Sequence, residues 1–180
     1  GAYEAERVRK RPGPKGVLLN MGAEPSKGTD LQREAYALLT EAGKAGRIHF
    51  VGNVEARGAV YGEVDVIVSD GYSGNIFLKT MEGTGGFMAK QLKAMFKKNL
   101  LTKLAAVLVS GGLRDFKKMM DAGEVGGTPL IGISKPVIKA HGSSDAFAIK
   151  NAIRQAQSFA ASGIIEDITE NIDHTRLRRE

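Results

Sequence analysis

Short apolar runs alternate with stretches of helical spacing along the first half of the chain. Three runs have the pattern of buried parallel strands, and they cover residues 16–22, 48–55 and 64–70. After the first run, Thr29 and Gln32 have the spacing of a capping box, and apolar positions then mark one helix face as far as Gly43. Strands that alternate with helices predict an α/β fold with a largely parallel sheet.

The second half of the chain continues this alternation. A helix is expected over residues 76–82, after the polar segment 71–75. Two further strands are expected over residues 129–133 and 137–140. Ser143 or Ser144 then caps a helix that Gly163 ends.

Residues 84–121 predict a basic helical hairpin with an apolar tip. Apolar residues recur at helical spacing and become nearly continuous from Leu100 to Val109. Three interpretations stay open for this hairpin: two helices packed into a core, an element that docks on another surface, or a dimer contact. A basic amphipathic helix is also what a membrane interface requires.

Composition narrows the class of protein. A length of 180 residues predicts a single α/β domain, and a hydrophobic fraction of 42% is that of a globular chain. The chain has no cysteine, which excludes disulfides and thiolate metal sites and fits a reducing cytoplasm. No apolar run approaches the length needed to span a bilayer.

The net charge of +6 is concentrated in one region. Residues 90–118 hold eight lysines and arginines and a single aspartate, so the rest of the chain is nearly balanced. Such a region attracts an acidic protein, anionic lipid or nucleic acid. Nucleic-acid binding needs exposed aromatic residues among the basic ones, and Phe96 and Phe116 lie at core-like spacing, so nucleic acid is not an expected partner.

Candidate chemistry lies where the strands end, because open α/β sheets bind ligands at that edge. Two segments there place glycine and polar residues at a helix start. Glycine lets the backbone approach a phosphate group closely, and the first helical turn offers it N–H donors. Their candidate phosphate-binding residues are Gly74, Asn75, Ser143 and Ser144, with Lys79 and His141 nearby in the sequence. The other candidates at the strand ends are Asn20, Gly52, Asn53 and Asp70. Simple helix capping is the better explanation of either segment taken alone, and the two segments together bring phosphate binding level with it.

Other chemistries have little support in the sequence. It contains neither a Gly-x-Gly-x-x-Gly segment after a strand nor a Gly-x-x-x-x-Gly-Lys-Ser/Thr segment, and no cofactor is expected. The three histidines are far apart, without metal-ligand spacing, so no metal site is expected. No Gly-x-Ser-x-Gly elbow supports a serine acyl-enzyme.

Four strings, in order and spacing, resemble the carboxyl-terminal half of the bacterial phosphate acyltransferase (PlsX) family. They cover residues 18–22, 50–57, 70–83 and 138–153. The resemblance runs from about Val8 to about Ser158. Members of this family are longer and begin with a half that this chain lacks, so the chain is expected to supply one side of a cleft.

The resemblance implies a fold and an activity. The fold is a three-layer α/β/α sandwich similar to that of isocitrate and isopropylmalate dehydrogenases and of phosphotransacetylases, with a protruding helical hairpin. The activity is transfer of a fatty acyl group from acyl carrier protein to inorganic phosphate, and the acyl phosphate then serves phospholipid synthesis.

The resemblance also implies partners and a location. Family members are homodimers on the inner face of the cell membrane, which they reach through the tip of the hairpin. By position, the residues expected in lipid are Leu100, Leu101, Leu104, Val107 and Leu108. The sequence leaves open whether the basic hairpin meets the carrier protein, anionic lipid or the other subunit.

The activity that the resemblance implies is consistent with the candidate phosphate sites if bound phosphate attacks the thioester carbonyl directly. The candidates for catalysis are Lys79 or His141, which would offset negative charge, and Asn75, which would donate to the thioester oxygen as Asn53 also could. Two alternatives remain: a phosphotransacetylase-like enzyme that uses acyl-coenzyme A, and a non-catalytic fragment that docks on membranes or dimerises.

Overall fold

A computed structural model describes residues 1–119, 124–142 and 144–172 of the chain. These residues form two compact units. The first unit holds residues 1–74, 129–137 and the described residues from 156 onward, and the second holds residues 75–128 and 138–155. The expectation of one domain that carries a hairpin stays a prediction.

A parallel three-stranded sheet is the centre of the first unit. Its strands are β1 (Lys15–Asn20), β2 (His49–Glu55) and β3 (Val66–Val68), in the order β2-β1-β3. Val17, Leu18 and Leu19 of the central strand are buried, as the apolar run predicts. The predicted α/β class with a parallel sheet is therefore confirmed.

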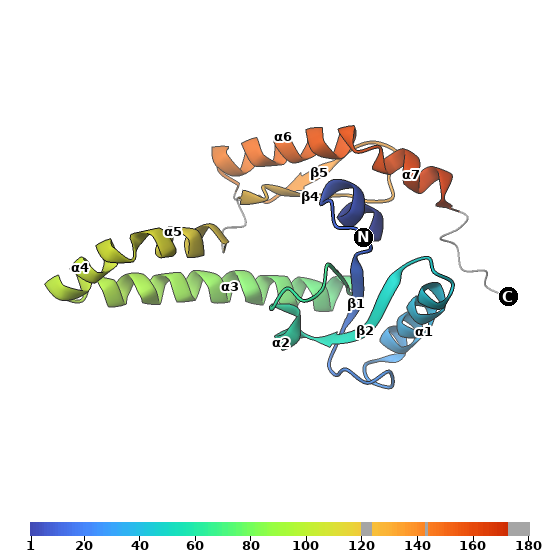
Figure 1. Ribbon diagram of the computed structural model, residues 1–180, viewed down its shortest axis with the longest axis horizontal. Coiled ribbons are helices and arrows are strands. Elements are labelled where there is room, and N and C mark those ends of the chain that lie inside the picture. The colour runs from blue at the N-terminus through green and yellow to red at the C-terminus, as the bar shows by residue number, and fades with distance from the viewer. Residues whose placement is uncertain (120–123, 143, 173–180) are drawn as a thin grey trace. The chain divides into compact units, whose positions relative to one another are not determined.

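Helix α1 (Asp30–Lys44) lies beside β2 in the same unit (Figure 1). The predicted capping pair is present, since Gln32 Oε1 accepts a hydrogen bond from the Thr29 N–H at 3.1 Å. Tyr36 of α1 meets Phe50 of β2 edge to face, with ring centroids 5.4 Å apart. An aromatic pair of this kind stabilises by about 1 kcal/mol beyond its buried area, which helps to fix the helix on the strand.

Three shorter helices also belong to the first unit. The π-helical turn η1 (Glu4–Val8) packs on α7 (Ile164–Glu170), and Arg7 pairs with Asp167 at 2.6 Å. Ile164 of α7 and Ala5 of η1 are both buried. Helix α2 (Ala56–Ala59) directly follows β2.

Helix α3 (Gly71–Phe96) starts in the first unit and continues into the second. The sequence predicts a turn at residues 71–75 and a helix over 76–82, and that boundary is wrong. The helix begins at Gly71 because the carboxylate of Asp70 accepts hydrogen bonds from its first N–H groups.

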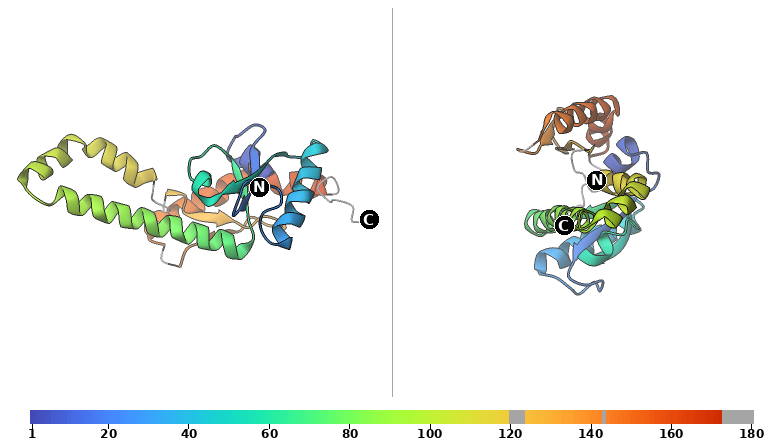
Figure 2. Two further views of the ribbon diagram at one scale, coloured as in Figure 1. Left: turned by 90° about the horizontal axis from the view of Figure 1, so that it is seen from below. Right: turned by 90° about the vertical axis from the view of Figure 1, so that its left-hand side faces the viewer.

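Two helices follow α3 in the second unit, α4 (Leu100–Leu108) and α5 (Ser110–Met119). They turn back from the far end of α3, as Figures 1 and 2 show. The turn is fixed by Thr102, whose hydroxyl donates to Phe96 O at 3.1 Å, and by Asn99, whose Oδ1 accepts from the Thr102 N–H at 2.9 Å. This reversal falls within the predicted hairpin, and the last residues of that hairpin, 120 and 121, lie outside the described residues.

The predicted later strands are shorter than expected. β4 (Gly127–Pro129) and β5 (Ile138–Ala140) form a separate two-stranded sheet. A strand over 129–133 is therefore wrong: the Leu130 N–H donates to Val137 O at 2.9 Å, which closes a loop over the intervening residues. Helix α6 (Ala146–Ala161) follows, as predicted from the sequence.

Within the second unit, the backbone before β4 lies directly against α6. Asn151 of α6 is only 4% exposed, and Ala148 and Ala152 are buried beside it. A Cβ at Gly126 would lie 2.6 Å from Ala148 O, and Gly126 has a φ of +84°. Only glycine combines this backbone conformation with so close an approach.

We predict that Gly126→Ala lowers the free energy of unfolding by about 3 kcal/mol, from the left-handed φ and the clash together. Gly132→Ala is the matched control, because Gly132 has a φ of +92° and open space around its Cβ position. Gly132→Ala should lower the free energy of unfolding by about 1 kcal/mol. Urea unfolding followed by circular dichroism measures both, and equal losses would contradict the close approach.

Candidate functional site

The carboxyl edge of the parallel sheet holds the loop of residues 21–28. The register pairs Asn20 with Glu55 and Leu18 with Val68, so the three strands end at one edge. Asn20 Nδ2 donates to Lys27 O at 3.1 Å, and Asn53 Nδ2 donates to Glu24 O at 2.9 Å. The predicted candidates Asn20 and Asn53 thus use their amide donors to hold a loop.

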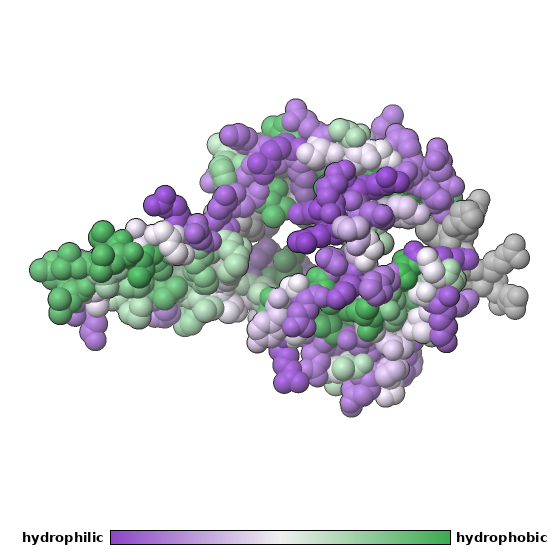
Figure 3. Space-filling view, viewed as in Figure 1, coloured by the Kyte–Doolittle hydropathy of each residue, from purple (hydrophilic) through white to green (hydrophobic). Residues whose placement is uncertain are grey.

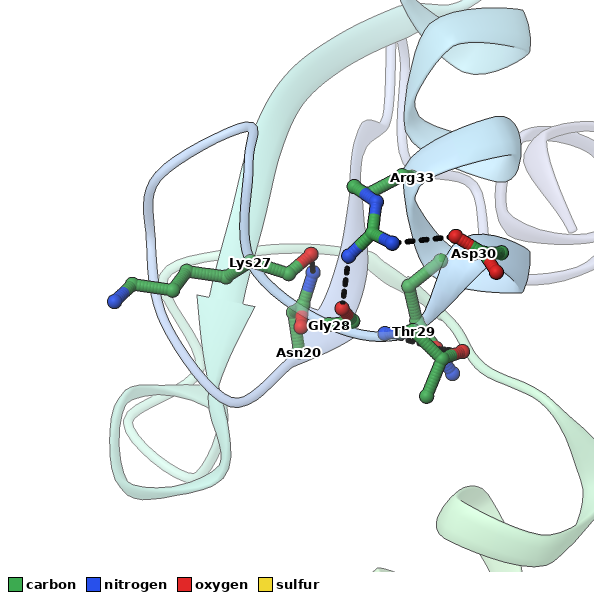
Figure 4. A network of polar contacts seen from close by, with 7 residues as sticks. Asn20, Lys27, Gly28, Thr29, Asp30 and Arg33 are labelled. Carbon is green, nitrogen blue, oxygen red and sulfur yellow. Dashed lines mark hydrogen bonds and ion pairs between the residues drawn. The ribbon is translucent and has the colours of Figure 1, made fainter.

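Side chains of the first turn of α1 bind the end of this loop (Figure 4). Arg33 donates to Gly28 O at 2.5 Å and pairs with Asp30. A Cβ at Gly28 would lie 2.7 Å from Asn20 Oδ1, so any larger residue would displace the asparagine. The loop is thereby held at both ends.

Asp70, just beyond β3, joins three segments of the first unit. Its Oδ1 accepts hydrogen bonds from the N–H groups of Tyr72 at 2.9 Å and Ser73 at 2.8 Å. Its Oδ2 accepts from Gln32 Nε2 at 3.0 Å. The carboxylate therefore caps α3 and links it to the first turn of α1.

These hydrogen bonds change the acidity of Asp70. The backbone N–H of Ser73, and next its side chain, lower the pKa of Asp70 below its ordinary value. Partial desolvation opposes this shift, while Tyr72 and Gln32 add to it. A carboxylate with a lowered pKa is a good hydrogen-bond acceptor and a poor general base at neutral pH.

The second predicted phosphate segment lies in the second unit. Asp145 caps α6, since its Oδ1 accepts from the Ala148 N–H at 2.9 Å, and the Ser144 N–H donates to His141 O at 3.0 Å. His141 is exposed, and Ser143 lies outside the described residues. The cap predicted at Ser143 or Ser144 is thus supplied by Asp145.

The backbone donors predicted to bind phosphate are largely occupied in this structure. The Gly74 N–H donates to Asp70 O at 3.0 Å, and the Ser144 N–H is bonded as described above. Lys79 Nζ lies 3.8 Å from Glu82 Oε2, and Asn75 is exposed. Phosphate binding at these residues stays a prediction, and it has to rely on side chains more than on backbone N–H groups.

Of the predicted strand-end residues, Asn20 ends β1, Asp70 follows β3, and Asn53 contacts the loop at this edge, whereas Gly52 lies inside β2. Asn75, Lys79, His141 and Ser144 belong to the second unit. Sequence reasoning missed the capping role of Asp145, although aspartate ranks with serine at helix starts. It also missed the Gln32–Asp70 bond, which joins residues 38 apart in sequence.

Comparison with known proteins identifies the family. The model of the family described as fatty acid synthesis protein matches residues 1–167. The chain therefore belongs to that family, and the resemblance seen in its sequence strings is confirmed.

Relatives of the chain share one name, phosphate acyltransferase. The protein of a Geobacillus species is 47% identical over 96% of this chain and 51% of its own length, and that of an Exiguobacterium species is 47% identical over 93% and 50%. The Alkaliphilus oremlandii protein is 46% identical over 96% and 50%. The chain spans about half the length of the curated relatives it matches.

Two further properties concern the described residues alone. Among them, no helix is both long enough and apolar enough to cross a bilayer. Nor do the described histidines, aspartates and glutamates gather in groups of three that would hold a metal ion.

We predict that Asp70 makes stability depend on pH. Its folded-state pKa lies below that of the unfolded chain, so its contribution is present above the ordinary carboxyl pKa of about 4 and is lost as the pH falls through the folded value. The difference in free energy of unfolding between wild type and Asp70→Ala should be largest near neutral pH and narrow in acid. Urea unfolding across this pH range measures it, and a constant difference would contradict the prediction.

Proposed function

We propose that the chain takes part in transferring a fatty acyl group from acyl carrier protein to inorganic phosphate, which supplies acyl phosphate for phospholipid synthesis. The observation that carries this proposal is the 47% identity to a phosphate acyltransferase over 96% of the chain. The parallel sheet supports it, since its carboxyl edge is where α/β folds bind ligands. We propose further that the chain forms part of a three-layer α/β/α sandwich of the dehydrogenase and phosphotransacetylase type, and that the protein is a homodimer.

The proposed reaction needs a bound phosphate beside a thioester. An oxygen of hydrogen phosphate attacks the carbonyl carbon, the new C–O bond forms and the C–S bond breaks. The proton that hydrogen phosphate loses passes to the sulfur, so the carrier leaves as its thiol. Lys79 and His141 supply or stabilise charge near the phosphate, and Asn75 donates to the developing oxyanion. The Ser144 hydroxyl is the further donor that this arrangement offers to phosphate.

We predict that Lys79→Met raises the KM for phosphate about tenfold in the full-length protein, because one cationic partner of the dianion is lost. Lys44→Met, at the exposed end of α1, is the control and should leave that KM unchanged. Formation of acyl phosphate from carrier thioester and phosphate is measured by trapping with hydroxylamine.

The same assay decides between the proposed enzyme and its alternative. A clear preference for short acyl-coenzyme A over acyl carrier protein would favour a phosphotransacetylase-like enzyme. A wild-type protein that forms no hydroxamate from either thioester would contradict the proposed function.

A second role, docking on an anionic membrane surface, has its own support in the hairpin helices. Figure 3 shows apolar residues gathered over α4 and the adjoining end of α3. Leu108 is 87% exposed and Leu104 57% exposed, and Leu100, Leu101 and Val107 are exposed as well. Helices that packed into a core of this chain would bury such residues, so their exposure argues against that interpretation.

The lysines around this surface suit anionic lipid. Each lysine or arginine close to an anionic bilayer contributes about 1 kcal/mol, and each buried leucine side chain about 2 kcal/mol. The basic residues lie on all three helices and in the segment between α3 and α4: Lys90, Lys93, Lys97, Lys98, Lys103, Arg114, Lys117 and Lys118. We therefore propose that the protein associates peripherally with the inner face of the cell membrane through this hairpin.

We predict that Leu104→Asp together with Leu108→Asp weakens binding to anionic vesicles at least about a hundredfold, since two apolar anchors are lost and two negative charges are added. Leu31→Asp is the matched control, because Leu31 is 59% exposed on α1. Vesicle flotation measures the bound fraction. Unchanged flotation of the double variant would mean that the hairpin binds another partner, such as the second subunit.

A further inference from the structure

The hydrogen-bond partners of Asp70 are those of a residue that holds the backbone in place, and not those of a residue that reacts with substrate. Both of its carboxylate oxygens are engaged: Oδ1 by the Tyr72 and Ser73 N–H groups, and Oδ2 by Gln32 Nε2. These hydrogen bonds join Asp70 to the first turn of α3 and to the first turn of α1. A carboxylate that touched phosphate directly would also repel it, because both groups are negatively charged.

Gln32 is held in one orientation by its other contact. Its Oε1 accepts from the Thr29 N–H at 3.1 Å and contacts the Thr29 hydroxyl. The amide therefore has to present Nε2 to Asp70. Only this orientation of the Gln32 amide lets its oxygen accept from Thr29 while its NH₂ group donates to Asp70.

We propose that Asp70 is a positioning residue for acyl transfer, fixing the first turn of α3 through one carboxylate oxygen while Gln32 holds the other. Asn75 and Lys79 follow on the same helix, in its second and third turns. A shift of the first turn moves both side chains, and a displacement of about 1 Å costs on the order of a hundredfold in rate. The proposal rests on the proposed function, because it assigns Asp70 a role in that same reaction.

The polarity of the Gln32–Asp70 hydrogen bond provides the test. Asp70→Asn keeps an oxygen for Tyr72 and Ser73 but places an NH₂ group against Gln32 Nε2. Gln32→Glu keeps the acceptor for Thr29 but places a carboxylate against Asp70. The double variant restores a matched bond of reversed polarity, in which the introduced asparagine amide donates to the introduced glutamate carboxylate.

We predict that each single variant of the full-length protein lowers kcat/KM for phosphate by about tenfold to a hundredfold, and that the double variant regains activity to within a few fold of wild type. The KM for acyl carrier protein should stay unchanged throughout. Amide hydrogen exchange at Tyr72 and Ser73 should be faster in each single variant and slow again in the double variant.

The outcomes separate the positioning role from the proposed function. If Asp70 acted through its charge on substrate or proton, Gln32→Glu would not rescue Asp70→Asn, and exchange at Tyr72 and Ser73 would not follow activity. Either result in an active enzyme would overturn the positioning role. A wild type that forms no acyl phosphate would instead overturn the proposed function, while the exchange data would still show whether Asp70 holds the turn.

Discussion

The N–H groups at the start of a helix need acceptors, and an aspartate carboxylate supplies them at both α3 and α6. Asp70 accepts from Tyr72 and Ser73, and Asp145 accepts from Ala148. At α3 this requirement also decides the local fold, because the same carboxylate accepts from Gln32 of α1. The end of β3, the start of α3 and the first turn of α1 are thus fixed by one side chain.

This capping limits how an anion can bind at the same helix starts. A helix N-terminus carries a partial positive charge of about half a unit, and a carboxylate in the first turn already balances it. Phosphate would then meet a like charge together with N–H groups that are bonded elsewhere. Cationic and neutral side chains have to provide the attraction, so the proposed mechanism relies on Lys79, His141, Asn75 and Ser144.

Local signals predict much of the fold; what they miss is the capping by two aspartates and one contact between residues distant in sequence. The strands β1 and β2 follow from apolar runs, and α1 follows from its capping box and helical spacing. The start of α3 was missed because glycines at 71 and 74 resemble a turn, whereas Asp70 makes them the first turn of a helix. The predicted role of the strand-end residues stays a prediction, and the Gln32–Asp70 bond has no local signature in the sequence.

Two groups of exposed apolar side chains, on the hairpin helices and on β3, differ in their charged neighbours. Those of the hairpin helices lie among lysines in the sequence, which suits anionic lipid. Ile67 and Val68 of β3 are also more than a third exposed, but Asp65 and Asp70 flank them in sequence. Parallel sheets are normally covered on both faces by polypeptide, and the curated relatives contain about as much chain again as the part that matches here. Charged neighbours of this kind support the proposed lipid surface for the hairpin and give no such support at β3.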